Sequence, residues 1–240
     1  GEGVIIFKPV YYPFSMAIEK NKRNIVNCPL IEKDGYYTID YEKFDEISKD
    51  PKNKLLIFCS PHNPVGRVWK KEELEKVAEI AVKNNLIVVS DEIWADLIMP
   101  GYEHYMMGRL GGEIEERLIT CTAPSKTFNL AGLATSSIII KNKELREKYS
   151  EMLEELIRYG KSLDYHGFQK SVMLIAESKY VVALIINGQL QKAEEYIKNE
   201  WEGKREGRSW QQVMTNLELS KKYQEKDAAG YSATLEKAGK

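Results

Sequence analysis

Short runs of apolar and β-branched residues recur along the first two thirds of the chain. Each run is bounded by glycine, proline, asparagine or charged residues, a pattern typical of short buried strands. The five runs that we expect to form strands are residues 4–7, 54–59, 86–90, 118–121 and 136–140.

Amphipathic segments lie between these runs. Residues 71–84 place four apolar side chains on one helical face and charges on the other, namely Leu74, Val77, Ala78 and Ala81. Asp40 can cap a shorter helix that carries Phe44 and Ile47. Because parallel strands need crossover connections, this alternation predicts a mostly parallel sheet covered by helices on both faces. The expected fold class is therefore α/β, with three α/β/α layers.

The last hundred residues have a different pattern. From Asn142 onward, apolar residues at helical spacing predict a long helix that ends near Gly160. A second amphipathic helix is predicted around residues 190–197, and Ser209 with Gln212 predicts a capping box at the start of one more. This part of the chain should be mainly helical.

Composition narrows the function. The 240 residues include 35 basic and 36 acidic side chains, for a net charge of −1, which argues against a general nucleic-acid binder. No run of eighteen apolar residues and no secretory signal are visible, so we expect no membrane partner. Three widely spaced cysteines suit a reducing compartment, and the cytoplasm is the expected location. The histidines and cysteines lack ligand spacing, so no metal site is expected.

Residues with catalytic chemistry follow three of the predicted strands. In open α/β sheets, ligands bind beyond the carboxyl ends of the strands. Asn63 follows the second run, Asp91 the third and Lys126 the fourth. A lysine can form a Schiff base, a carboxylate can keep a ring nitrogen protonated, and an amide can hydrogen-bond to a phenolate oxygen. The three residue types together suit pyridoxal phosphate.

Each of these residues also has an ordinary interpretation when it is taken singly. A lysine after a strand is usually a solvated surface charge. Asp91 could be a helix cap, with the following Glu92 as the exposed carboxylate. Asn63 could satisfy its own turn, and an isolated tyrosine such as Tyr11 is more often a core residue. The order of the motifs favours the cofactor interpretation.

Several of these motifs resemble those of fold-type-I pyridoxal-phosphate enzymes, the class I and II aminotransferases. The sequence of these motifs most resembles that of the MalY/PatB branch of cystathionine β-lyase-like C–S lyases. The resemblance is carried by residues 3–14, 60–69, 90–93 and 122–133, in family order. It covers about residues 1–158 and implies a cofactor-binding large domain over residues 1–141, truncated at its N-terminus. Residues 142–240 would form a helical linker and a divergent C-terminal region.

The resemblance also implies roles for individual residues. Lys126 resembles the catalytic lysine that forms an aldimine with the cofactor and later moves the α-proton. Asp91 resembles the partner of the pyridine nitrogen, and Asn63 resembles the donor to the phenolic oxygen. The implied function is C–S β-lyase activity on cystathionine-like amino acids. Transamination of an amino acid is the alternative from the same family.

Three further residues are implied in cofactor binding. Tyr11 matches the aromatic residue that stacks on the cofactor ring. Ser125 and Thr122 neighbour the lysine, where family members often contact the phosphate. The resemblance does not decide which of the two makes that contact. The family also implies a homodimer whose sites are completed across the interface.

The chain departs from the family in ways that matter for activity. Family members carry an N-terminal stretch with a phosphate-binding glycine turn before the position that matches Gly1. Trp94 stands where the branch usually has histidine or tyrosine. The arginine that grips the substrate carboxylate is not assigned, and Arg205 and Arg208 are candidates only by residue type. A non-catalytic, aminotransferase-like fragment or scaffold is therefore the second hypothesis, since truncation could abolish activity.

Overall fold

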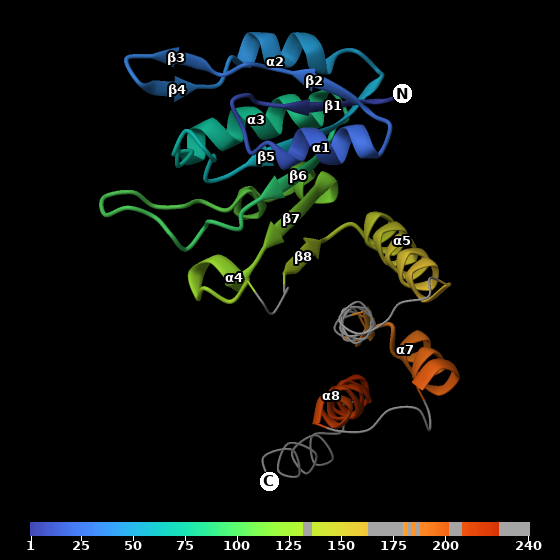
Figure 1. Ribbon diagram of the computed structural model, residues 1–240. Helices are drawn as coiled ribbons and strands as arrows, with labels where there is room; N and C mark the ends of the chain where they lie inside the picture. Colours follow the sequence, from blue (N-terminus) through green and yellow to red (C-terminus); the bar gives the residue numbers. More distant parts are fainter. Residues whose placement is uncertain (132–135, 163–179, 182–183, 186–187, 202–207, 226–240) are drawn as a thin grey trace. The chain divides into compact units, whose positions relative to one another are not determined.

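A six-stranded sheet lies at the centre of the first of two units, Gly1–Arg146 and Glu147–Lys240. The computed structural model describes residues 1–131, 136–162, 180–181, 184–185, 188–201 and 208–225 (Figure 1). Its strands are β1 (Gly3–Ile6), β2 (Asn24–Asn27), β5 (Asn53–Cys59), β6 (Ile87–Asp91), β7 (Leu118–Thr122) and β8 (Ser137–Ile140). Their order is β2-β1-β5-β6-β7-β8, and only β8 runs antiparallel to its neighbour.

Helices cover both faces of this sheet, as the alternation of patterns predicts. Ile5 of β1 packs in the core beneath α2 (Tyr41–Ser48) and α3 (Lys71–Lys83). Ile6, the next residue, points to the opposite face and packs beneath α1 (Pro13–Lys20). Because successive strand residues face opposite ways, a strand that is apolar throughout must be covered twice. The three-layer α/β/α prediction is confirmed.

The two helices on the larger core begin and pack as expected. The side chain of Asp40 accepts a hydrogen bond from the backbone N–H of Lys43 (2.9 Å) and so caps α2. All four of the apolar residues predicted on α3 are buried, namely Leu74, Val77, Ala78 and Ala81. Full burial of one leucine side chain is worth roughly 1.5–3 kcal/mol, so this stripe fixes α3 on the sheet.

A polar cluster joins the two helices at one end. Asp45 on α2 pairs with Lys49 (2.8 Å) and with Lys83 near the end of α3 (3.0 Å). The side-chain amide of Asn84 also donates to Asp45 (3.1 Å). These three hydrogen bonds hold the pKa of the Asp45 carboxyl well below its usual range.

Some short elements were not predicted. The edge strand β2 and the hairpin β3 (Ile31–Lys33) with β4 (Tyr36–Thr38) are three or four residues long and largely exposed, so no apolar run marks them. Two 3₁₀ helices, Met107–Leu110 and Gly112–Arg117, precede β7, and the one-turn α4 (Pro124–Thr127) follows it.

The second unit is helical in the residues that the structure describes. Its helices are α5 (Lys143–Ser162), which begins in the first unit, α7 (Leu190–Tyr196), the π-helix Ile197–Trp201 and α8 (Arg208–Gln224). α5 ends at Ser162, two residues after Gly160, in line with the predicted end near that glycine. The helix predicted from Ser209 is present as α8, but Ser209 is its second residue, so the predicted capping position is wrong. Buried apolar residues of this unit share one core: Ile157, Tyr180, Val181, Leu184, Ile185, Leu190, Ala193, Ile197, Val213 and Leu217.

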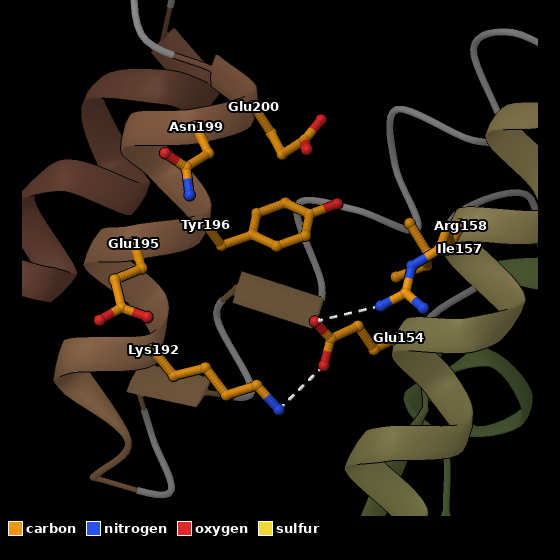
Figure 2. A pocket seen from close by; sticks show the side chains of 8 residues that line it. All are labelled: Glu154, Ile157, Arg158, Lys192, Glu195, Tyr196, Asn199 and Glu200. Carbon is orange, nitrogen blue, oxygen red and sulfur yellow. Dashed lines mark ion pairs between the residues drawn. The ribbon is translucent and has the colours of Figure 1, made fainter.

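Glu154 links two helices of this unit across a cavity of about 260 Å³. Figure 2 shows its carboxylate between Lys192 of α7 (2.9 Å) and Arg158 of α5 (3.9 Å). The cavity is lined by acidic and basic side chains that partly neutralise one another. Such partly exposed pairs are each worth at most about 1 kcal/mol, so we interpret the cluster as a structural link.

Candidate active site

Asn63 lies in a loop that follows β5 at the carboxyl edge of the sheet and is closed by backbone hydrogen bonds. Within this loop, the N–H of His62 donates to the carbonyl of Arg67 (2.8 Å), and the N–H of Gly66 donates back to the carbonyl of His62 (2.8 Å). Gly66 has φ +72°, a conformation that glycine adopts without strain. The ring Nε2 of His62 lies 3.0 Å from the carbonyl of Pro9, which joins this loop to the one after β1.

Asn63 lines a pocket of about 450 Å³. One wall is the loop itself: Pro61, His62, Asn63, Pro64, Gly66 and Val68. The other wall comes from the long connection between β6 and β7, which Figure 1 shows in green, and consists of Trp94, Leu97, Met99 and Tyr102. The pocket therefore has one polar amide among mostly apolar walls, as small-molecule sites commonly do.

Asp91 is the last residue of β6 and lies in register with Cys59 of β5 and Cys121 of β7. Burial raises the pKa of the Asp91 carboxyl, and the negative charge of Glu92 adds to that effect. A hydrogen bond from the N–H of Ile93 (3.2 Å) and the positive charge of Lys126 act in the opposite direction. Asp91 is thus a largely desolvated carboxylate that a cationic group would stabilise.

Lys126 lies on α4, directly after β7. Its Nζ is 5.2 Å from the centre of the Trp94 ring, which also lines the Asn63 pocket. Pro124 opens this short helix, and Thr127 Oγ1 donates to Asp96 Oδ2 (2.8 Å) on the β6–β7 connection. The lysine is exposed, so its amine is accessible to a ligand. Lys126, Asp91 and Asn63 are therefore brought together at the carboxyl edge of three neighbouring strands.

Of the six candidate residues, only Asn63 lines this pocket, and the three that remain, Tyr11, Thr122 and Ser125, lie near the same edge of the sheet. Tyr11 is 41% exposed, and its ring centre lies 5.7 Å from that of Phe14 in an edge-on contact. Thr122 ends β7 and Ser125 lies in α4, and both are half-buried. Their roles toward a cofactor stay predictions.

The contact between Glu92, the residue after Asp91, and His104 could not be predicted from the sequence. Glu92 is not the exposed carboxylate of the pair: it is 1% exposed and lies against His104, whose Nε2 is 2.7 Å from Glu92 Oε2. Twelve residues separate the two, and no periodicity connects them. The apolar pocket wall between them, Leu97 to Tyr102, was also missed because those residues follow neither a helical nor a strand pattern.

The cysteines that flank Asp91 are not activated nucleophiles. Burial raises the pKa of Cys59 to about 12 and that of Cys121 to about 11. Both therefore remain thiols at neutral pH. Within the described ranges, no group of three histidine, cysteine, aspartate or glutamate side chains is arranged to hold a metal ion. No helix of those ranges is long and apolar enough to span a lipid bilayer.

Fold and site together define a class: an open, mostly parallel α/β protein whose ligand-binding edge presents an amine, a carboxylate and an amide. Comparison with known proteins identifies the family within this class. The family model described as aminotransferase class I and II matches residues 1–198. The chain belongs to this family.

The chain is similar to several characterised members of the family. It is 45% identical to cystathionine beta-lyase PatB of Bacillus subtilis (strain 168) over 154 residues, 64% of this chain and 40% of that protein. It is 37% identical to aspartate aminotransferase of Pyrococcus abyssi over 134 residues, 55% of this chain and 33% of that protein.

A solved structure extends the similarity to the fold. The crystal structure of cystalysin from Treponema denticola, which contains pyridoxal 5'-phosphate, is 43% identical with a TM-score of 0.64, and covers 85% of this chain and 52% of that one. The chain thus spans about half the length of the relatives that it matches, or less.

Proposed function

We propose that this chain is the pyridoxal-phosphate-binding part of a C–S β-lyase that acts on cystathionine-like amino acids. The observation that carries the proposal is the meeting of Lys126, Asp91 and Asn63 at one edge of the sheet. The similarity to PatB and to cystalysin, a protein whose structure contains this cofactor, supports the choice of cofactor and reaction.

The residues at this edge fit the cofactor in their chemistry. The Asp91 carboxylate is buried enough to raise its pKa, so an added cationic ring nitrogen would relieve an unfavourable burial. Asn63 lines a pocket large enough for a small aromatic ligand, and Trp94 lines the same pocket from the other side. The hydroxyls of Ser125 and Thr122 and the ring of Tyr11 are our candidates for phosphate contact and ring stacking.

Bound pyridoxal phosphate would supply an aldehyde that condenses with amines and a cationic ring that stabilises a carbanion. Asp91 would hold the proton on the ring nitrogen. Asn63 would donate to the phenolic oxygen and orient the ring. Lys126 would hold the cofactor covalently and, once the substrate amine has replaced it, would remove the proton from the substrate's α-carbon. General acid–base help of this kind is typically worth 10²–10⁴ in rate.

The proposed reaction balances as a β-elimination followed by hydrolysis. Lys126 would take the α-proton, the bond between Cβ and sulfur would break, and the sulfur would leave as a thiol after gaining a proton. Water then converts the remaining fragment to pyruvate and ammonia. For cystathionine, the products would be homocysteine, pyruvate and ammonia.

Transamination is the second candidate, because the chain is also similar to aspartate aminotransferase. A non-catalytic scaffold is the third, because no residue of this chain is assigned to hold a substrate carboxylate. A homodimer is expected from the family, and equilibrium sedimentation of the purified chain would test it.

One experiment separates these candidates. The chain is titrated with pyridoxal phosphate while visible absorbance is recorded, then treated with borohydride and digested for peptide mapping, with Lys126→Ala as the control. Label on Lys126 with pyruvate and ammonia released from cystathionine supports the lyase. Label on Lys126 with only keto-acid exchange supports transamination. No label on Lys126 refutes both enzymatic proposals and leaves the scaffold.

A further inference from the structure

Glu92 is a carboxylate held at the centre of a hydrogen-bonded cluster beside the proposed site. Its side chain is fully buried and that of His104 is 7% exposed, and His104 Nε2 lies 2.7 Å from Glu92 Oε2. Glu92 Oε1 accepts from Ser90 Oγ (2.9 Å) and from the backbone N–H of Met107 (3.2 Å). Both oxygens of the buried Glu92 carboxyl group therefore have hydrogen-bond partners, as buried polar groups require.

These bonds connect two ends of one long segment. Glu92 stands at the end of β6, whereas His104 and Met107 close the connection that leads toward β7. The middle of that connection, residues 95–103, forms no helix or strand, and Figure 1 shows it extending away from the sheet. A loop of this kind is expected to take its position mainly from its anchors.

The same loop supplies the outer wall of the Asn63 pocket. Leu97, Met99 and Tyr102 line that pocket and are nevertheless 48%, 74% and 68% exposed. Side chains so exposed bury little apolar surface and cannot fix the loop by themselves. Thr127 on α4 bonds to Asp96 near the beginning of the loop, but the half that contains Met99 and Tyr102 leads directly to His104.

We propose that Glu92 is a positioning residue, which fastens the 93–107 loop through His104 and the Met107 N–H and so holds the Met99 and Tyr102 wall over the Asn63 pocket. The inference rests on the proposed function for its catalytic consequence, but the fastening itself concerns only this chain's residues. Since the reacting groups would be held by Asp91, Asn63 and Lys126, loss of the Glu92 anchor should weaken ligand retention more than it slows chemistry.

The test compares matched variants of the whole chain. His104→Leu removes the donor to Glu92, and His104→Gln retains an N–H donor at a similar reach. Glu103→Gln is the control, because it changes the neighbouring exposed residue of the same loop. Hydrogen exchange of peptides from residues 95–107 is measured without cofactor, with β5 peptides as the reference for the stability of the sheet.

We expect exchange in residues 95–107 to accelerate at least tenfold in His104→Leu while β5 stays within twofold of the unmodified chain. His104→Gln and Glu103→Gln should stay close to the unmodified chain. With pyridoxal phosphate bound, His104→Leu should raise KM for cystathionine about tenfold and lower kcat by less than threefold.

Two results would overturn the proposal. Unchanged exchange of the loop in His104→Leu would mean that Glu92 does not fasten it. Equal acceleration in the loop and in β5 would mean that the cluster contributes only general stability. If the unmodified chain binds no pyridoxal phosphate, the proposed function fails, while the exchange comparison still decides whether Glu92 positions the loop.

Discussion

Replacement of Glu73 by alanine should destabilise the first unit strongly, because it leaves a buried guanidinium without its partner. Arg67 is 6% exposed, and its Nη2 bonds to both carboxylate oxygens of Glu73 (2.8 and 2.7 Å). The guanidinium also donates to the carbonyl of Tyr37 and lies 4.3 and 4.4 Å from the ring centres of Tyr36 and Trp69. Since Arg67 closes the loop that carries Asn63, this pair also supports the candidate site.

The magnitude follows from burial. Breaking a buried ion pair from one side typically costs 3–5 kcal/mol, and the Glu73 side chain is still 20% exposed, so about 3 kcal/mol applies here. Glu73 also accepts from the backbone N–H of Lys70 (2.8 Å) at the start of α3, a capping bond worth about 1 kcal/mol. We therefore expect a loss of about 4 kcal/mol. A typical domain with 5–15 kcal/mol of stability would remain folded.

Native-state hydrogen exchange of β5 peptides measures this loss within the first unit. At 1.4 kcal/mol per factor of ten, β5 exchange through global opening should accelerate by roughly a thousandfold. Glu75→Ala is the matched control on the same helix: Glu75 pairs with Lys71 at 3.4 Å with both side chains 51% exposed, so its loss should cost about 0.5 kcal/mol or less.

A double-mutant cycle with Arg67→Met isolates the pair from the capping bond, since the cap is lost whether or not Arg67 is present. We expect a coupling energy of about 2 kcal/mol or more for residues in such direct contact. Additive effects within about 0.5 kcal/mol would refute the claim that the Arg67–Glu73 pair holds this loop.

Three other outcomes are expected. Asp40→Ala removes the α2 cap and should cost about 1 kcal/mol in urea unfolding, whereas an unchanged midpoint would contradict the capping assignment. Asp91→Asn and Asp45→Asn should have opposite effects. Asp91, with its raised pKa, binds its proton more tightly when folded, so Asn should stabilise the apo chain at neutral pH, with the gain shrinking as the pH falls toward about 4. Asp45, with its lowered pKa, stabilises the fold at neutral pH, so Asn should destabilise it there and lose this effect in acid; melting curves at several pH values check both signs. Cys121 should react with a thiol reagent at pH 8 far more slowly than a free peptide cysteine, because its pKa is about 11.

The sheet could be predicted from the sequence because its strands are marked by their own residues. The inner strands β1, β5, β6 and β7 are covered on both faces and are therefore mostly apolar, so each was visible as a short run. The edge strand β8 was visible as well, because it contains three consecutive isoleucines. The edge strand β2 was not, since it is half-exposed and reads as two asparagines around Ile25 and Val26. The end of α5 could also be predicted, because glycine is typical of a helix end and α5 ends at Ser162, two residues after Gly160.

The candidate residues could be predicted because Asp91 ends a strand and Asn63 and Lys126 come shortly after one, and the carboxyl ends of neighbouring parallel strands meet at one edge. The positions of Asn63, Asp91 and Lys126 at strand ends therefore predict that these residues lie near one another, whatever path the loops between them take. The Glu92–His104 contact could not be found in this way. It depends on how the connection after β6 folds back, and that path is fixed by tertiary contacts rather than by periodicity.

The placement of the site within one unit has a consequence for how the chain should be tested. Asn63, Asp91 and Lys126 all belong to the unit Gly1–Arg146, and the contacts that fix them also lie inside it. In the proposed function, covalent capture of the cofactor by Lys126 would rest on these contacts, whereas turnover would also need residues that hold a substrate. Cofactor labelling and substrate turnover can fail separately, so a chain that is labelled on Lys126 but turns over no substrate would still support the assignment of the three residues.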